Sequence, residues 1–311
     1  MTPDAFSSAR PLRIGTRRSP LALAQAEMAA AAIKAAHGLA DDAVTLVPML
    51  ASGDKIQDRP LADIGGKALW TKELERALID DQIDIAVHSM KDVETVRDES
   101  FTISAMLPRA DVRDRLIGAV SIDELTTGAR VGTSSPRRAA QMLRLRPDLQ
   151  IMPLRGNVAT RLARIDAGEA DATLLAAAGL DRLAMFDVGH AISVELLLPA
   201  ASQGAVGIDR LAKRADLDPL LAAINDVPTY VAVMAERDFL AGLSGNCHSP
   251  VAALALVDGN EMHLRGQIFS EDGSEMRTGE IRFALDDVDA PARLALWLLE
   301  QSSPALRALF D

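Results

Sequence analysis

The stretch that decides the fold reads Ile83-Asp84-Ile85-Ala86-Val87-His88-Ser89-Met90-Lys91-Asp92. Its first half is a short run of mainly β-branched apolar residues, which predicts a buried strand. Its second half is polar, and open α/β sheets bind ligands just beyond the carboxyl ends of their strands. Lys91 and Asp92 therefore form a candidate acid–base or ion-binding pair. The alternative is that Asp92 caps the next segment and that Lys91 is solvated.

The composition limits the classes of protein to which the chain can belong. Its 311 residues favour two or three domains. A hydrophobic fraction of 49% with 25% charged residues is typical of a soluble globular protein. The net charge of −11 argues against a general nucleic-acid or anionic-membrane surface. The scattered histidines and the single cysteine lack the spacing of metal ligands, so we expect no metal.

The beginning of the chain shows no targeting pattern. Residues 1–10 lack the apolar core of a signal peptide. The most apolar early stretch, residues 21–33, contains charged and amide side chains and is too short to span a bilayer. We therefore expect a cytoplasmic protein that does not bind a membrane.

Predicted strands alternate with predicted helices through most of the chain, which favours parallel α/β sheets. The expected strands are residues 12–16, 44–50, 83–87, 101–107, 116–120, 130–133, 150–154, 171–176 and 205–208. We expect the last of these to return to the first domain. From residue 228 the pattern changes to a helix, three antiparallel strands at 251–257, 262–269 and 277–284, and two closing helices. This pattern predicts a small α+β domain.

Basic side chains recur where a predicted strand meets a predicted helix. Arg17 precedes a helix that Ser19 caps and Pro20 opens, and free N–H groups at such a junction suit an anion. Arg137 and Arg138 lie in the first turn of a later helix, where cations are unfavourable. Either an anion is expected there or both side chains point to solvent.

The same arrangement is repeated at two further junctions, which deliver Arg155, Arg161 and Arg182. This repetition favours an anion-binding sheet edge over a chance distribution of solvated arginines. Lys67 follows Gly65-Gly66 at another predicted helix start and either meets an anion or is exposed. The spacing around it is not that of a P-loop.

Cys247 is the only cysteine and lies in the loop Ser244-Gly245-Asn246-Cys247-His248-Ser249-Pro250. Free cysteines are usually buried apolar fillers, whereas this polar loop suits a reactive or modified thiol. His248 is poorly placed as a catalytic base because it is adjacent in sequence, so a cysteine protease is disfavoured.

Taken together, these motifs resemble the porphobilinogen deaminase family of tetrapyrrole biosynthesis, whose members are hydroxymethylbilane synthases. The resemblance covers almost the whole chain in order. Its matching stretches are residues 16–23, 65–67, 84–93, 132–135 with 137–138, 154–157, 203–207 and the loop around Cys247.

The resemblance implies an α/β fold with two domains similar to periplasmic binding proteins, the first discontinuous, and a small C-terminal α+β domain with a three-stranded antiparallel sheet. The expected domains are residues 1–107 with 204–222, residues 112–200, and residues 227–311, the last carrying the cofactor. It also implies a monomer whose product passes to uroporphyrinogen III synthase.

The resemblance further implies a transferase that uses a dipyrromethane cofactor held through a thioether to Cys247. Four porphobilinogen units are joined to it head to tail with loss of ammonia, and water then releases hydroxymethylbilane. Asp92 is the expected catalytic residue, because a carboxylate beside a pyrrole N–H stabilises cationic states and moves protons. Each pyrrole carries an acetate and a propionate, which arginine binds in bidentate fashion. The implied binding residues are Arg17, Ser19, Lys67, Ser89, Lys91, Thr133, Ser134, Ser135, Arg137, Arg138, Arg155, Gly156, Arg161, Arg182 and Gln203.

Some positions depart from the family pattern. Asp63 stands where several relatives have Lys, which puts one anion contact in doubt. Trp70 replaces a Phe, Glu94 stands where Pro is usual, and Pro136 where Leu is common. None of these changes removes a group that the chemistry requires.

Two other classes of protein compete with this interpretation. A solute-binding protein of the same architecture would need the arginines but neither Cys247 nor Asp92, and it would release no ammonia. A nucleic-acid binder that uses residues 137–164 is disfavoured by the acidic net charge and by an aromatic content of 3%.

Overall fold

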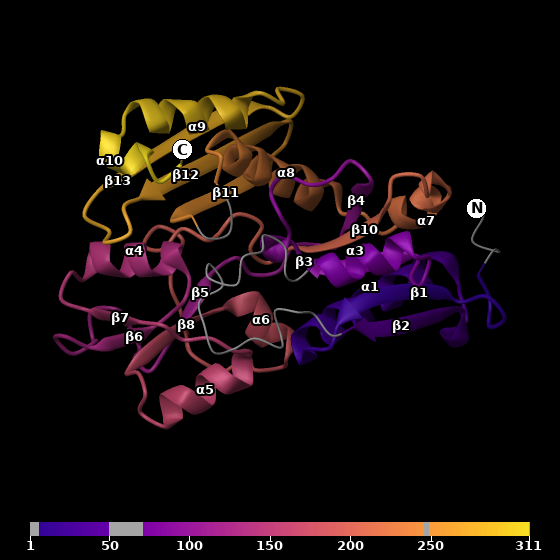
Figure 1. Ribbon diagram of the computed structural model, residues 1–311, viewed down its shortest axis with the longest axis horizontal. Coiled ribbons are helices and arrows are strands. Elements are labelled where there is room, and N and C mark those ends of the chain that lie inside the picture. Colours follow the sequence, from indigo (N-terminus) through magenta and orange to yellow (C-terminus); the bar gives the residue numbers. More distant parts are fainter. Residues whose placement is uncertain (1–5, 50–70, 246–248, 311) are drawn as a thin grey trace. The chain divides into compact units, whose positions relative to one another are not determined.

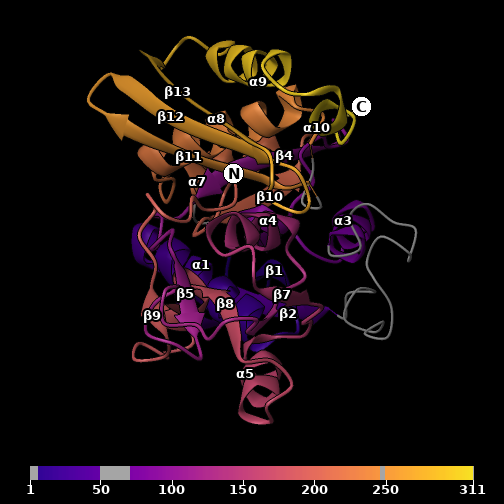
Figure 2. The ribbon, with the colours of Figure 1, turned by 90° about the vertical axis from the view of Figure 1, so that its left-hand side faces the viewer.

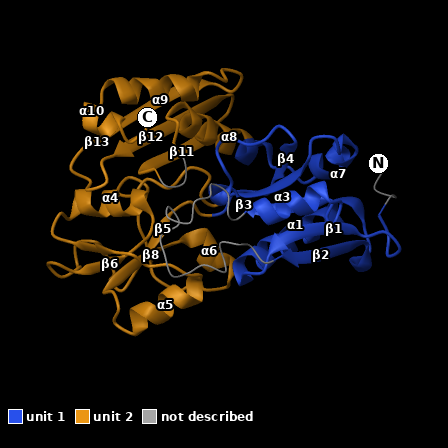
Figure 3. Cartoon of the chain, viewed as in Figure 1, with its two compact units in different colours: residues 1–110, 205–230 blue, residues 111–204, 231–311 orange. Residues whose placement is uncertain are grey.

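The computed structural model describes residues 6–49, 71–245 and 249–310. The chain divides into two compact units (Figure 3): unit 1 comprises Met1–Ala110 and Ala205–Tyr230, and unit 2 comprises Asp111–Gly204 and Val231–Asp311. The expected second and third domains thus fall in one unit. The division into three domains, with its boundaries, stays a prediction.

Unit 1 is built on a five-stranded sheet with the strand order β2-β1-β3-β10-β4. Strands β1 (Leu12–Arg17), β2 (Val44–Met49) and β3 (Ile85–Ser89) are parallel. Strand β10 (Val206–Leu211) lies between β3 and β4 (Phe101–Met106) and is antiparallel to both. The expected return of the 205–208 strand to the first sheet is therefore confirmed.

Helices cover both faces of this sheet because its strands are apolar on both sides. Ile85 and Val87 of β3 join one core with α1 (Pro20–His37) and α7 (Asp218–Ala222). Ala86, on the opposite face, packs with α3 (Lys72–Ile79). Figure 1 shows α1 alongside β1. Short 3-10 turns complete the unit: η2 (Asp41–Ala43), η4 (Met90–Asp92) and η5 (Ala215–Leu217).

Unit 2 begins with a second five-stranded sheet of order β7-β6-β8-β5-β9. Its strands are β5 (Asp114–Ile117), β6 (Arg130–Gly132), β7 (Gln150–Met152), β8 (Ala172–Ala176) and β9 (His190–Ala191). Strands β6, β7 and β8 are parallel, while β5 is antiparallel to β8 and β9. Helices α4 (Pro136–Leu145), α5 (Val158–Asp166) and α6 (Ala177–Arg182) connect them.

The rest of unit 2 is a three-stranded antiparallel sheet of β11 (Val251–Asp258), β12 (Glu261–Phe269) and β13 (Met276–Ala284). Helices α8 (Val227–Gly242) and α9 (Ala290–Glu300) form the core on one face, and α9 runs over the sheet in both views (Figures 1 and 2). Ala252 and Leu254 face the other way, toward Ala140 of α4. Helix α10 (Pro304–Arg307) follows α9.

The α/β fold class with a three-stranded antiparallel C-terminal sheet is confirmed, and the expectation of parallel sheets holds for only part of each five-stranded sheet. Both five-stranded sheets are mixed, because β10 and β5 enter antiparallel to their neighbours. An apolar run of residues predicts burial but does not encode strand direction. The sequence analysis also missed α7 and the two-residue strand β9. No helix in the described part of the chain is long and apolar enough to cross a membrane.

Asp84 is a buried carboxylate at the amino end of β3. It accepts hydrogen bonds from the Arg13 backbone N–H at 2.9 Å and from Arg13 Nε at 3.0 Å. Arg214 donates to its other oxygen at 3.3 Å. Burial alone would raise the pKa of Asp84, but these hydrogen bonds and charges hold it below its ordinary value of 3.8.

We predict that Asp84→Asn lowers the free energy of unfolding at neutral pH by about 1–3 kcal/mol, because charged hydrogen bonds are lost. The pKa of Asp84 is depressed in the folded state, so its contribution is complete above 3.8 and is lost as the pH falls toward the folded value. Urea unfolding at a series of pH values should show the two proteins converging in acid. A difference that does not depend on pH would contradict this role.

Candidate active site

In unit 1, the expected site residues gather at the carboxyl ends of β1 and β3. A pocket there is lined by Arg17, Ser19, Ser89 and Asp92, together with the backbone and side chains of Leu21, Ala22, Gln25, Thr71, Val87 and His88. The parallel pairing of β1 with β3 brings these sequence-distant groups to one sheet edge. Arg17, Ser19, Ser89 and Asp92 thus lie together at one sheet edge.

Ser19 caps α1, as the sequence predicted. Its hydroxyl oxygen accepts from the Ala22 backbone N–H at 3.3 Å, and Pro20 occupies the first helical position. The hydroxyl hydrogen remains available to a ligand acceptor, because the cap uses only the oxygen.

Gln25 is a site residue that the sequence analysis missed. It is 2% exposed, and its amide donates to Ser89 Oγ at 2.7 Å. Ser89 Oγ donates in return to Gln25 Oε1 at 3.1 Å. The available signal was a lone amide side chain on the buried, otherwise alanine-rich face of α1. This pair fixes the orientation of Ser89.

Asp92 ends the short η4 turn and is half-buried. The N-cap of this turn, Ser89, makes no side-chain capping hydrogen bond. Among the described residues, the Asp92 carboxylate has neither a hydrogen bond nor an ion pair. It is thus an uncommitted acceptor that lines the pocket.

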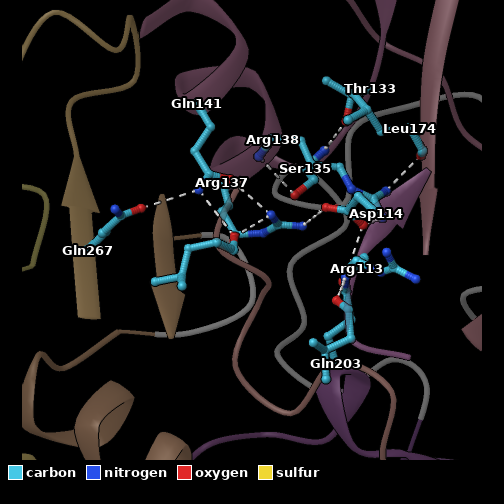
Figure 4. Close-up of polar contacts among 12 residues, drawn as sticks. Arg113, Asp114, Thr133, Ser135, Arg137, Arg138, Gln141, Leu174, Gln203 and Gln267 are labelled. Carbon is cyan, nitrogen blue, oxygen red and sulfur yellow. Dashed lines mark hydrogen bonds and ion pairs between the residues drawn. The ribbon is translucent and has the colours of Figure 1, made fainter. Parts of the chain in front are cut away.

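In unit 2, a single buried carboxylate organises three of the expected binding residues (Figure 4). Asp114, at the start of β5, accepts from Arg137 at 2.8 Å and from Arg138 at 2.6 Å. Gln203 donates to the same carboxylate at 2.9 Å. The anion expected beside the two arginines therefore belongs to the protein itself, and neither guanidinium points to solvent: Arg137 is 3% exposed and Arg138 6%.

Burial alone would raise the pKa of Asp114, but Arg138 and Arg137 outweigh it and hold the pKa far below its usual range. Burial lowers the pKa of Arg137, while the Asp114 charge acts in the opposite direction. Because one carboxylate faces two guanidinium groups, the cluster keeps a net positive charge. A buried net charge favours a further anionic partner.

Three of the expected arginines have a buried donor without a partner, as does Arg97 outside the expected set. The Nε atoms of Arg137, Arg138 and Arg182 are buried and have no hydrogen-bond partner among the described residues. Arg182 also donates to the Gly204 carbonyl oxygen at 2.7 Å, and burial lowers its pKa. Buried unpaired donors are costly in a protein, so these three fit a ligand that brings several carboxylates.

The expected hydroxyl residues, Thr133 to Ser135, follow the carboxyl end of β6, and the junction that carries Arg155 follows that of β7. Ser135 caps α4 by accepting from the Arg138 N–H, Thr133 Oγ1 accepts from the Ser135 N–H, and Ser134 donates to the Leu154 carbonyl oxygen. Gly156 has a φ of +111°, which favours glycine, and a Cβ there would lie 2.7 Å from Thr160. Arg161 Nε donates to the Gly156 carbonyl oxygen at 2.9 Å. Arg155 lies beside this turn in sequence and is half-buried.

Two expected site residues, Lys67 and Cys247, lie outside the described residues, as do Asp63 and Trp70. The described part of the chain holds no group of three or more His, Cys, Asp or Glu side chains that could bind a metal ion.

The fold and the two groups of residues define an α/β protein with buried arginines for a polycarboxylate ligand and a free carboxylate in a pocket. Residues 12–218 match the family described as "Porphobilinogen deaminase, dipyromethane cofactor binding domain", and residues 230–300 match its C-terminal domain. A porphobilinogen deaminase of Sphingopyxis alaskensis is 59% identical, with 99% of this chain and 98% of the relative covered. One from Paracoccus denitrificans is 50% identical, with 87% of each covered.

The chain belongs to the porphobilinogen deaminase family. It is a transferase that synthesises hydroxymethylbilane from porphobilinogen with a dipyrromethane cofactor, in tetrapyrrole biosynthesis.

Two solved structures that the chain resembles are periplasmic binding proteins. A periplasmic sulfonate-binding protein, SsuA from Methylobacillus flagellatus, matches with a TM-score of 0.40 at 14% identity, covering 76% of this chain and 70% of that one. A TRAP periplasmic solute-binding protein from Desulfovibrio salexigens matches with a TM-score of 0.41 at 11% identity, covering 74% and 75%.

We predict that Asp114→Asn lowers the free energy of unfolding by about 3–5 kcal/mol, because it leaves two buried guanidinium groups without their carboxylate. Urea unfolding measures this loss. The matched control is Asp148→Asn, which removes a more exposed pair with Arg146 in the same unit and should therefore cost much less. Equal losses in the two variants would show that Asp114 does not organise the site.

Proposed function

We propose that Asp92 is the catalytic residue of hydroxymethylbilane synthesis in this chain. The observation that supports this role is the position of its carboxylate, which lines the unit 1 pocket with no partner among the described residues. A carboxylate so placed can accept a pyrrole N–H and stabilise positive charge on the ring.

The reaction needs such a group at two points. The bond between the methylene carbon and the ammonium nitrogen of porphobilinogen breaks. The nitrogen leaves as ammonia, and the azafulvene left behind is cationic. A pyrrole ring carbon then forms a C–C bond to the methylene carbon, after which the attacking ring must lose a proton. Asp92 stabilises the cation through the ring N–H and accepts that proton. The bound dipyrromethane supplies the ring carbon to which the first unit is joined.

The remaining residues of the two groups bind carboxylates. In unit 2, the unpaired Nε donors of Arg137, Arg138 and Arg182 support this role. Asp114 fixes the orientation of the Arg137 and Arg138 side chains. We assign the acetate and propionate groups of the cofactor and substrate to Arg17, Ser19, Lys67, Ser89, Lys91, Thr133, Ser134, Ser135, Arg137, Arg138, Arg155, Gly156, Arg161, Arg182 and Gln203.

We further propose that the cofactor is attached to Cys247 through a thioether. Two features support this: Cys247 is the only thiol of the chain, and its flanking loop resembles the family's attachment loop. By the same resemblance, residues 1–107 with 204–222, 112–200 and 227–311 act as three domains. The protein works as a cytoplasmic monomer that passes its product to uroporphyrinogen III synthase.

Asp92→Asn should reduce turnover by about 100-fold or more, because general acid–base groups contribute roughly that much, while the fold stays intact. Asp92→Glu keeps a carboxylate but displaces it, so its loss should be smaller. Ammonia release and hydroxymethylbilane formation measure turnover, and circular dichroism measures the fold.

The control is Asp98→Asn, which removes an exposed carboxylate farther along the same segment, where it accepts from the Ser100 N–H. This variant should keep parental turnover. If Asp92→Asn stays within a few-fold of the parent, Asp92 does not have the proposed role.

A further inference from the structure

A cluster of four ionisable side chains lies on the α3 side of the unit 1 sheet, and one of them, His88, also lines the pocket described above. Its members, here called the Asp209 cluster, are Glu75 of α3, His88 of β3, Asp209 of β10, and Arg97 in the loop before β4. Asp209 is 1% exposed and His88 7%, and the Arg97 side chain is 9% exposed. Charged groups are rarely buried to this extent unless they are paired.

Asp209 is the centre of this cluster. Its Oδ2 accepts a hydrogen bond from a terminal nitrogen of Arg97 and lies 3.4 Å from His88 Nε2. The other terminal nitrogen of Arg97 donates to Glu75 Oε1 at 3.0 Å. The Arg97 guanidinium also lies 5.3 Å from the centre of the Phe101 ring, within the range of a cation–π contact.

The two partners of Asp209 flank the segment that carries Asp92. His88 directly precedes residues 89–92 on β3, and Arg97 follows them in the loop that leads to β4. A single carboxylate on β10 therefore holds this segment before and after Asp92.

Met90, in the middle of the segment, contacts residues at the start of β10 and just before it. The Met90 N–H donates to the Ala205 carbonyl oxygen at 3.1 Å. Met90 is buried against Gly207 so closely that a Cβ on the glycine would lie 2.0 Å from the Met90 sulfur. Ala205 and Gly207 thus contact Met90 directly, while Asp209 contacts the residues on either side of the segment.

Stability alone does not account for a cluster of this kind. Apolar side chains of similar volume often replace a buried ion pair with no loss of stability. Burial would raise the pKa of Asp209, but His88 and Arg97 hold it below its ordinary value, so the carboxylate stays ionised. An ionised, directional contact fixes the position of its partners more narrowly than apolar packing does.

We propose that Asp209 is a positioning residue for the reaction: through His88 and Arg97 it holds residues 89–92 so that the Asp92 carboxylate faces the pyrrole N–H of the substrate. This inference rests on the catalytic role proposed for Asp92. Asp209 touches neither substrate nor cofactor in this account.

The test is Asp209→Asn in the cofactor-loaded enzyme, which keeps the side-chain shape and removes the charge. Misplacement of a catalytic group by about 1 Å costs up to about 100-fold, so kcat should fall by about 10- to 100-fold. KM should stay within about twofold, because the protein side chains that bind the substrate carboxylates are unchanged. Parental kcat in the folded, loaded variant would overturn the proposal.

Asp84→Asn is the matched control. Asp84 is likewise buried and paired with two arginines, but it lies at the opposite, amino end of β3. This variant should lose stability and keep kcat when assayed below its melting temperature. An equal fall in kcat would mean that Asp209 has only a structural role.

Arg97→Gln is the second variant, and it covers the case in which Asp209→Asn does not fold. It should also lower kcat by about 10-fold with little change in KM. The double variant should be no worse than the poorer single one, because both remove the same contact. Additive losses, or an unchanged kcat in Arg97→Gln, would overturn the proposal.

Asp92→Asn, assayed beside these proteins, separates the two claims. If it is inactive while Asp209→Asn retains parental kcat, only the positioning role fails. If it retains turnover, the catalytic role of Asp92 fails, and the positioning role fails with it.

Discussion

Each unit contains a buried carboxylate that contacts two buried basic side chains. In unit 2, Asp114 holds Arg137 and Arg138 at the start of α4, a place where cations would otherwise be unfavourable. In unit 1, Asp209 holds His88 and Arg97 on either side of the segment that carries Asp92. In both, a charge that is expensive to bury is retained, and the positioning role proposed for Asp209 offers a reason for it in unit 1.

Local patterns in the sequence predicted the parts of the fold that depend on neighbouring residues. The apolar run before Ser89 became β3, and the Ser19-Pro20 pair became the cap of α1, because both depend on residues a few positions apart. The position of Asp92 in a pocket beyond β3 followed from the same logic. What the local pattern did not contain was strand direction, so the antiparallel entry of β10 and β5 had to come from the structure.

The residues that were missed share one property: their partners are distant in sequence. Asp114 follows Arg113 in a polar stretch and resembles a surface residue until β5 brings it to Arg137 and Gln203. Gln25 and Ser89 meet only because α1 packs against β3. The arginines were identified by their repetition at strand–helix junctions, but their unpaired Nε donors, which favour a polycarboxylate ligand, are visible only in the folded protein.

The central claim is that this chain builds hydroxymethylbilane on a dipyrromethane held by Cys247, and the intact mass of the purified protein tests it most directly. The account predicts that the parent exceeds the mass of the bare chain by two pyrrole units and that Cys247→Ala shows no such excess. A parent protein that keeps the bare-chain mass even after incubation with porphobilinogen, or a Cys247→Ala variant that carries the same adduct, would contradict it.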